Sequence, residues 1–123
     1  YESLAELDDD LALLRVATGL RTADGFRVRD AERPEDARAV VLTDARERRL
    51  VDVSIHRVER RLLYADGVTC VGDSGGPLLG ADGAVLGVAS WRTRGSCERP
   101  GTAAFVRLGA HLAWIRETAL DDR

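Results

Sequence analysis

Short apolar runs of strand length, separated by turn residues, make up most of this sequence and restrict the folds it can adopt. Residues 50–55 alternate apolar and polar side chains, as a half-buried strand does, and the Asp82-Gly83 pair is typical of a tight hairpin turn. Strand candidates lie at 11–14, 39–42, 50–55, 62–64, 77–79, 85–89 and 102–106. Only the C-terminal end changes to helical spacing. Its apolar positions are Leu108, Leu112, Ile115 and Ala119. Many short strands followed by one helix predict an all-β fold, a small β-barrel with a C-terminal α-helix.

The size and charge of the chain exclude several classes of function. Its 123 residues are enough for one domain with a sizeable core. The formal net charge of −3 gives no general attraction for nucleic acid or for an anionic membrane. No apolar run approaches the roughly 20 residues that a membrane-spanning helix needs. We therefore expect no nucleic-acid partner and no membrane segment.

The two cysteines, Cys70 and Cys97, do not indicate a metal site. Common zinc motifs contain pairs of ligands separated by only about two to four residues, and these two cysteines are much farther apart. An even number of cysteines is compatible with one disulfide or with two buried thiols. We expect neither a metal nor a cofactor.

The hexapeptide Gly-Asp-Ser-Gly-Gly-Pro at residues 72–77 carries the clearest chemical signal. A nucleophilic serine needs backbone N–H groups beside it to hold the oxyanion that forms when its oxygen attacks a carbonyl. Flanking glycines let the chain turn so that such N–H groups converge. A shorter Gly-x-Ser-x-Gly would also suit an α/β-hydrolase, but that fold needs alternating helices that this sequence does not show. Ser74 is therefore the candidate nucleophile, and the alternative is a glycine-rich turn that happens to contain serine.

The surroundings of this hexapeptide resemble the C-terminal part of the chymotrypsin/trypsin family of serine proteases. The segment 10–14, Asp-Leu-Ala-Leu-Leu, is similar to the family's Asp-Ile-Ala-Leu-Leu. Further matches, in the family's order and spacing, are 70–78, 86–91, Cys97, 100–101 and 114–115. The clear resemblance covers residues 8–14 and about 50–118. It implies the second, six-stranded antiparallel barrel of a double-barrel fold, and serine endopeptidase activity on polypeptide substrates.

The resemblance also implies how the chain is divided. Residues 1–17 would form the last strand region of the first barrel and carry the triad aspartate. Residues 18–38, rich in Arg, Asp, Glu and Gly, would be a solvated connection between the barrels. Residues 39–123 would form the second barrel and the terminal helix.

Catalytic roles follow from the resemblance residue by residue. Ser74 would attack the scissile carbonyl, and the N–H groups of Gly72 and Ser74 would form the oxyanion hole. Asp10 would orient the catalytic histidine and stabilise its charged form. Asp73 resembles the aspartate that pairs with the new N-terminal amine of an activated zymogen, and its alternative role is to cap local backbone N–H groups.

Cys70 and Cys97 occupy the positions of the family's disulfide between the two walls of the specificity pocket. Such a bond implies an oxidising compartment, so a secreted or periplasmic protein is expected. The sequence contains 18 arginines and no lysine. This bias suggests the codon usage of a GC-rich genome and a bacterial origin.

The resemblance places the substrate-binding residues around the same pocket. They would be Val68, Thr69, Ser90, Trp91, Arg92 and Gly101. Val68 stands at the pocket base, where an enzyme that cleaves after Arg or Lys has an aspartate, and a buried cation there would be unpaired. Arg92 stands where the family often has glycine, so it would narrow the pocket, attract an acidic side chain or simply point to solvent. We predict cleavage after small or medium apolar residues, with acidic specificity as the alternative.

The chain supplies no histidine in the family's position before the aspartate. His56 and His111 both follow Asp10 and are interpreted as ordinary surface or half-buried residues. We therefore expect the base to come from an N-terminal protease chain or subunit that forms the first barrel. The alternative is a non-catalytic, protease-like binding or regulatory module. The intact set of Ser74, Gly72 and Asp10 favours catalysis.

Overall fold

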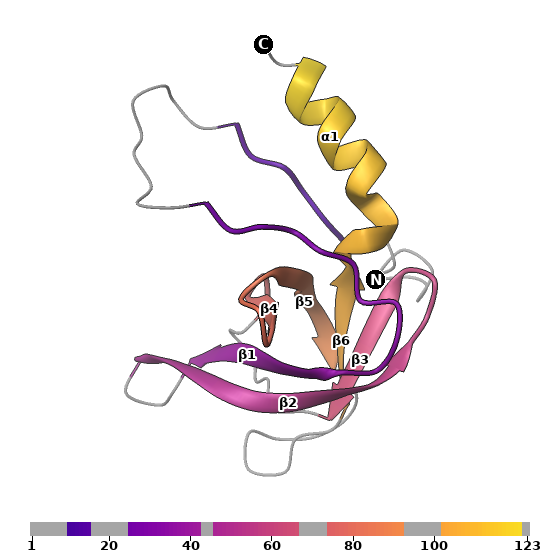
Figure 1. The fold of residues 1–123 in the computed structure, drawn as a ribbon. Helices are drawn as coiled ribbons and strands as arrows, with labels where there is room; N and C mark the ends of the chain where they lie inside the picture. The colour runs from indigo at the N-terminus through magenta and orange to yellow at the C-terminus, as the bar shows by residue number, and fades with distance from the viewer. Residues whose placement is uncertain (1–9, 16–24, 43–45, 67–73, 93–101, 122–123) are drawn as a thin grey trace.

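Six antiparallel strands close into a barrel, and one helix follows the last strand (Figure 1). The computed structural model describes residues 10–15, 25–42, 46–66, 74–92 and 102–121. The strands are β1 (Asp36–Leu42), β2 (Arg48–Val58), β3 (Leu62–Asp66), β4 (Pro77–Gly80), β5 (Val85–Arg92) and β6 (Thr102–Arg107). Their order around the barrel is β1-β2-β3-β6-β5-β4, and β4 pairs with β1 to complete the circle. The predicted six-stranded antiparallel barrel is confirmed.

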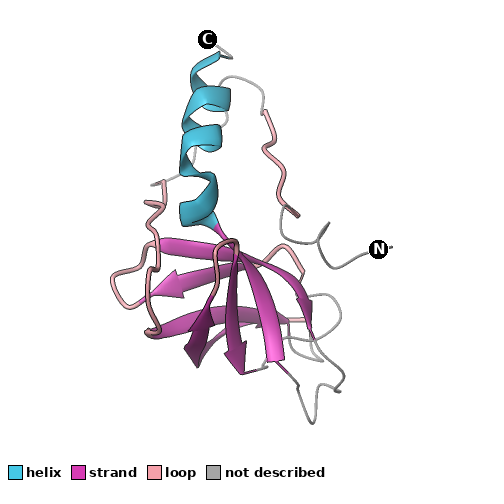
Figure 2. Ribbon diagram, turned by 90° about the vertical axis from the view of Figure 1, so that its right-hand side faces the viewer, coloured by secondary structure: helices cyan, strands magenta, loops and turns pink. Residues whose placement is uncertain are grey.

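The helical ending is also confirmed. A 3₁₀ helix spans Leu108–His111 and continues directly into α1 (Leu112–Asp121). In Figures 1 and 2, α1 extends away from one end of the barrel. Leu108 is buried against the barrel, whereas Trp114 on α1 is 42% exposed, so the 3₁₀ helix rather than α1 provides the tighter packing.

The larger buried cluster draws residues from all six strands, and Leu62, Tyr64 and Ala104 form a second, smaller cluster. The side chains with the least exposed surface are Phe105, Ile55, Leu63, Leu78, Leu86 and Val106. The β4–β5 hairpin turns at Ala81–Gly83, where Gly83 N donates to Gly80 O at 2.9 Å, as the Asp-Gly pair predicted. Alternation accounts for the burial of Val53 and Ile55 on β2, whereas β3, β4 and β6 bury consecutive residues on both of their faces.

The apolar run at 11–14 does not form the strand that its sequence suggests. Residues 10–15 have no strand assignment, and Leu14 is 88% exposed. A closed barrel offers no free strand edge, so these residues find no pairing partner in the described part of the chain. The strand β1 begins at Asp36, which is slightly earlier than the predicted end of the connection at residue 38.

The connection before β1 is fastened to the barrel rather than simply solvated. Val28 forms an isolated parallel bridge with Val85, supported by the hydrogen bonds Arg29 N to Val85 O (3.1 Å) and Val85 N to Arg27 O (2.8 Å). Arg29 also bridges Glu35 at 2.8 Å and Asp82 at 3.0 Å. The pKa of Arg29 is raised, mainly because its side chain donates hydrogen bonds to Glu35 and, as the second cause, to Asp82.

A second attachment joins this connection to the end of β6. Arg107 donates from both Nε and Nη2 to the two carboxylate oxygens of Asp30, at 2.7 Å each. The two side chains are 18% and 25% exposed, so the pair is largely shielded from water. A Cβ on Gly109 would overlap the Asp30 carboxylate, so glycine is required there for this close approach. The connection is therefore held at both β5 and β6.

We expect Asp30→Asn to lower the free energy of unfolding at pH 7 by about 1–2 kcal/mol, because Arg107 loses its ionic partner in a partly buried position. The pKa of Asp30 lies below its ordinary value of 3.8, mainly because Arg107 donates hydrogen bonds to the carboxylate. A carboxyl whose folded-state pKa is lowered contributes its stability above the unfolded-state pKa and loses it as the pH falls toward the folded-state pKa. The difference between wild type and Asp30→Asn should therefore shrink when urea unfolding is measured at about pH 3.

The matched control is Asp52→Asn, which changes an exposed carboxylate on β2. It should have little effect on stability at either pH. An equal loss for both variants at pH 7 would show that net charge, rather than the Asp30–Arg107 pair, is responsible.

Candidate active site

Ser74 lies in a turn that immediately precedes β4, and its side chain is exposed. Gly75 has a φ of 84°, in the left-handed region that suits glycine, so the sequence Ser-Gly-Gly permits this turn. Two hydrogen bonds attach the turn to β5: Gly75 N donates to Ala89 O at 2.8 Å, and Ala89 N donates to Gly76 O at 2.9 Å. The candidate nucleophile is therefore accessible and is positioned by a strand.

Asp10 contacts the same part of β5 that holds the Ser74 turn. The Ser90 hydroxyl donates a hydrogen bond of 2.7 Å to Asp10 Oδ2, although the two residues are 80 positions apart in the chain. Ser90 directly follows Ala89, the residue that holds the Ser74 turn. Adjacent residues of one strand thus anchor the candidate acid and the turn that carries the candidate nucleophile.

The Ser90–Asp10 contact adds a role that the sequence interpretation missed. Ser90 was predicted only as a substrate-binding residue on the strand that pairs with substrate backbone. Its hydroxyl also orients the half-buried Asp10 carboxylate. Nothing in the local sequence of either residue signals this pairing, because it depends on how a segment before the barrel lies against β5.

Several predicted site residues lie outside the described residues, so their roles stay predictions. These are Val68, Thr69, Cys70, Gly72, Asp73, Cys97 and Gly101. Trp91 and Arg92 lie on β5, where their backbones pair with Ala104 and Ala103 of β6. Their side chains lie outside the part of the chain that the structure describes.

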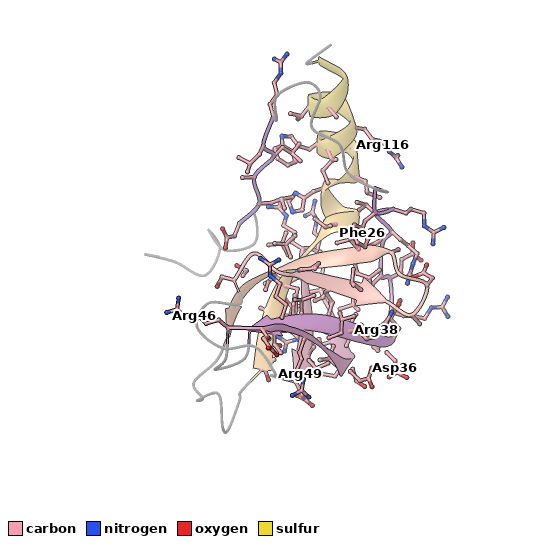
Figure 3. All side chains as sticks on the ribbon, turned by 90° about the vertical axis from the view of Figure 1, so that its left-hand side faces the viewer. Phe26, Asp36, Arg38, Arg46, Arg49 and Arg116 are labelled. Carbon is pink, nitrogen blue, oxygen red and sulfur yellow. The ribbon has the colours of Figure 1, made fainter. Side chains whose placement is uncertain are left out.

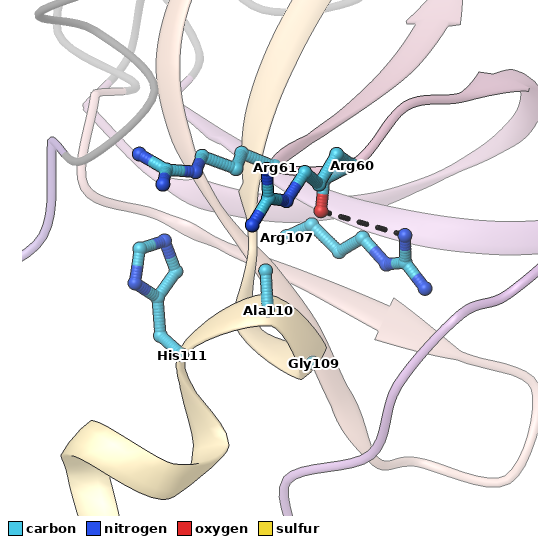
Figure 4. Close-up of a pocket in the computed structure, with 6 residues that line it drawn as sticks. All are labelled: Arg60, Arg61, Arg107, Gly109, Ala110 and His111. Carbon is cyan, nitrogen blue, oxygen red and sulfur yellow. Dashed lines mark hydrogen bonds between the residues drawn. The ribbon is translucent and has the colours of Figure 1, made fainter.

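The two histidines belong to other parts of the barrel. His56 lies on β2, with Nε2 at 3.4 Å from Asp66 Oδ1, and β3 and β6 separate β2 from β5 in the barrel order. His111 ends the 3₁₀ helix and lines a pocket with Arg60, Arg61 and Arg107 (Figure 4). Neither histidine contributes to the arrangement formed by Ser74, Ser90 and Asp10. Among the described residues, no group of three or more His, Cys, Asp or Glu side chains could hold a metal ion.

A closed six-stranded antiparallel barrel, with an exposed serine in a glycine turn and an aspartate hydrogen-bonded to the strand that holds this turn, is typical of trypsin-like serine protease barrels. The family model described as Trypsin matches residues 14–115 of this chain. The chain belongs to the trypsin family.

Individual relatives agree with this assignment over shorter segments. The chain is 44% identical over 50 residues to Serine protease 1 of Drosophila melanogaster, a match that covers 40% of this chain and 19% of that protein. It is 37% identical over 70 residues to Kallikrein 1-related peptidase b21 of Mus musculus, covering 52% and 26% respectively. The matched segments therefore span only about a fifth to a quarter of these curated relatives.

A solved structure shows the same fold. A mutant of human heparin binding protein superposes with a TM-score of 0.61 at 23% identity, covering 77% of this chain and 48% of that chain. This chain thus corresponds to about half of that structure. In the part of the chain that the structure describes, no helix has the length and apolar character needed to cross a membrane.

Proposed function

We propose that Ser74 is the nucleophile of a serine endopeptidase whose active site is completed by a histidine from a segment outside this chain. The hydrogen bond between Ser90 and Asp10 is the observation that carries the proposal. It holds a carboxylate beside the strand that also positions the exposed Ser74 turn. Membership of the trypsin family supports the same assignment.

The proposed reaction uses these residues in three steps. Ser74 Oγ attacks the carbonyl carbon of the scissile peptide bond, while the incoming histidine takes the hydroxyl proton. The N–H groups of Gly72 and Ser74 stabilise the negative charge on the carbonyl oxygen of the tetrahedral intermediate. The tetrahedral intermediate then collapses: the C–N bond breaks as the histidine gives its proton to the leaving amine, and the acyl group stays on Ser74 Oγ. In the last step the histidine takes a proton from water, the resulting hydroxide attacks the acyl carbon, and the ester bond breaks as Ser74 Oγ regains its proton. Asp10 keeps the imidazole in the required tautomer throughout.

The exposed apolar residues before the barrel support a first barrel as the partner that supplies the histidine. Leu13 is 42% exposed and Leu14 is 88% exposed, and both follow the candidate triad aspartate closely. Leaving two adjacent leucines in water is unfavourable by up to about 1.5–3 kcal/mol each. Packing of a histidine-bearing barrel against this segment would bury them and would bring its imidazole to Asp10.

The proposal is tested by labelling the whole protein, together with any companion chain, with a fluorophosphonate probe that reacts with activated serines. We expect one label, located on Ser74 by peptide mapping, and no label in Ser74→Ala. Ser54→Ala is the matched control, because Ser54 is an exposed serine on β2 whose hydroxyl donates to Asp36 at 3.0 Å. Absence of labelling in wild type, under conditions that label a known serine protease, would favour the non-catalytic module instead.

We further propose that the enzyme cleaves after small or medium apolar residues. The resemblance to the family implies Val68 as the base of the pocket, where a buried cation would lack a partner. Profiling the whole protein against a peptide library measures this preference directly. Strong cleavage after Arg or Lys would contradict the proposal, and cleavage after Asp or Glu would assign the determining role to Arg92.

A further inference from the structure

An apolar pocket with a volume of about 390 Å³ lies on the outer face of the barrel. Its apolar lining residues are Phe26, Val40, Leu50, Pro77, Leu79 and Val85, and its polar ones are Arg48 and Arg49. No acidic side chain is among them. The pocket shares no residue with the arrangement of Ser74, Ser90 and Asp10, and the inference drawn from it does not depend on the proposed protease activity.

The strand pattern places apolar side chains on the outside of the barrel at this pocket. Ala39 of β1 belongs to the core cluster, so its neighbour Val40 points outward. Val53 of β2 also belongs to that cluster, so Leu50, which lies an odd number of positions away, points outward as well. The outward positions of antiparallel strands are usually polar. Packing of the core therefore does not explain the apolar residues found here.

These outward residues form a band across four neighbouring strands. Leu50 of β2 pairs with Val40 of β1, and Leu79 of β4 pairs with Val85 of β5. Because β1 pairs with β4, the two pairs are joined, and we call the four residues the apolar stripe. Three spacings of about 4.8 Å between adjacent strands give the stripe a width of about 14 Å.

Both ends of the apolar stripe are in contact with water. Leu50, at the β2 end, is 51% exposed. Phe26, which is 72% exposed, lies at the β5 end, because Val85 N donates to the carbonyl of the following residue, Arg27, at 2.8 Å. Apolar side chains gathered into one exposed patch mark a binding surface, whereas singly scattered ones do not. The stripe therefore favours a ligand with an apolar part long enough to cross it.

The pocket carries its positive charge at the β2 end of the apolar stripe. Arg48 and Arg49 are exposed residues at the start of β2, directly before Leu50. Among the described residues, neither guanidinium group has an ion-pair partner. A guanidinium group donates two parallel hydrogen bonds to a carboxylate. The pocket thus offers an anion-binding group at one end and apolar surface along the rest of its length.

We propose that this pocket binds a free fatty acid of medium chain length. The carboxylate accepts hydrogen bonds from Arg48 and Arg49, and the chain lies along the apolar stripe toward Phe26. An extended chain of about ten carbons has nearly the length of the stripe, about 14 Å. The pocket volume lies at the lower end of the range for small-molecule sites, which suits a single chain.

The experiment is calorimetric titration of the whole protein, together with any companion chain, with decanoate below the concentration at which it forms micelles. We expect saturable binding, and we expect Arg48→Gln with Arg49→Gln to weaken it by at least about tenfold. The matched control is Arg33→Gln with Arg116→Gln, which removes the same charge at two exposed positions outside the pocket. Figure 3 shows Arg116 on α1, at the opposite end of the molecule from Arg49. The control should stay within about twofold of wild type.

Two further ligands separate the roles of the head group and the chain. Decyltrimethylammonium keeps the chain but reverses the charge, and we expect it to bind at least about tenfold more weakly than decanoate. Hexanoate keeps the carboxylate but has a shorter chain, and we expect a similar loss. Because a six-carbon chain is too short to cross the stripe, Phe26→Ala should weaken decanoate by about fivefold and leave hexanoate unchanged.

Four results would overturn the proposal. Absence of saturable decanoate binding would indicate that another part of the protein covers the apolar stripe. Equal affinities for decanoate and decyltrimethylammonium would indicate unspecific adsorption to apolar surface. Unchanged affinity in the variant of Arg48 and Arg49, or an equal loss in the control variant, would remove the carboxylate site. Tighter binding of an acidic apolar peptide, such as acetyl-Leu-Leu-Val-Asp, would assign the pocket to a protein partner.

Two measurements protect these results from effects on folding. Urea unfolding of each variant checks that a loss of binding is not a loss of structure. Transfer of magnetisation from the decanoate chain to the Phe26 ring, measured by NMR on wild type, locates the chain without any substitution. We expect this transfer for decanoate and not for hexanoate.

Discussion

Replacing Asp10 with asparagine is expected to lower kcat/KM for peptide hydrolysis by about 10⁴-fold. In the proposed mechanism, an amide in this position preserves the shape of the side chain but favours the wrong tautomer of the incoming histidine and cannot stabilise its charged form. Ser90 can still bond to the amide oxygen, so the local fold should survive. The measurement is steady-state hydrolysis of a peptide substrate by the whole protein, with urea unfolding as a check on stability.

Ser90→Ala separates the orienting hydrogen bond from the charge. It removes one donor to the Asp10 carboxylate, at 2.7 Å, and leaves the negative charge in place. We therefore expect a loss of only about tenfold in kcat/KM. If Asp10→Asn retained activity within tenfold of wild type, Asp10 would not be the residue that orients the histidine.

Phe105→Ala should be the most destabilising single substitution in the core, with a loss of about 3–5 kcal/mol in the free energy of unfolding. Phe105 is 1% exposed and lies on β6, opposite Leu63 on β3 and Ala89 on β5. Its removal would leave a cavity inside the barrel that the surrounding strands cannot fill, because their hydrogen bonds fix their spacing. Urea unfolding monitored by circular dichroism measures the loss.

Phe26→Ala is the matched control for this substitution. Phe26 (Figure 3) is 72% exposed, so the same change in side chain removes little buried surface. The expected effect is less than about 1 kcal/mol. Comparable losses at the two positions would mean that Phe105 does not contribute to a tightly packed core.

The elements of the barrel could be predicted from the sequence because their signals are local. The strand at Arg48–Val58 contains the alternating run 50–55, and its inward residues Val53 and Ile55 are buried as the alternation requires. The Asp82-Gly83 pair correctly located the β4–β5 hairpin. The apolar spacing from Leu108 onward correctly indicated the helical ending, although not that its first turn is a 3₁₀ helix.

The contacts that position the site could not be predicted because they join distant segments. Ser90 and Asp10 are 80 positions apart, and Arg107 and Asp30 are 77 apart. In the sequence, the charged residues of 18–38 suggest a solvated connection, since charge alone does not reveal a partner. In the structure, Arg29 and Asp30 are half-buried and form ion pairs with residues of the barrel. The composition of residues 18–38 therefore indicated a connecting segment, but not that this segment pairs with residues of the barrel.

The attachment of residues 27–29 to Val85 has a mechanical consequence. Val85 begins β5, and Ser90, which anchors Asp10, lies farther along the same strand. Tension transmitted through the connection would act on β5 along its length. Because Val85 accepts from Arg29 N and donates to Arg27 O, these two hydrogen bonds would share the load. Movement of the segment before the connection would thus be transmitted to β5, the strand that contacts both Asp10 and the Ser74 turn.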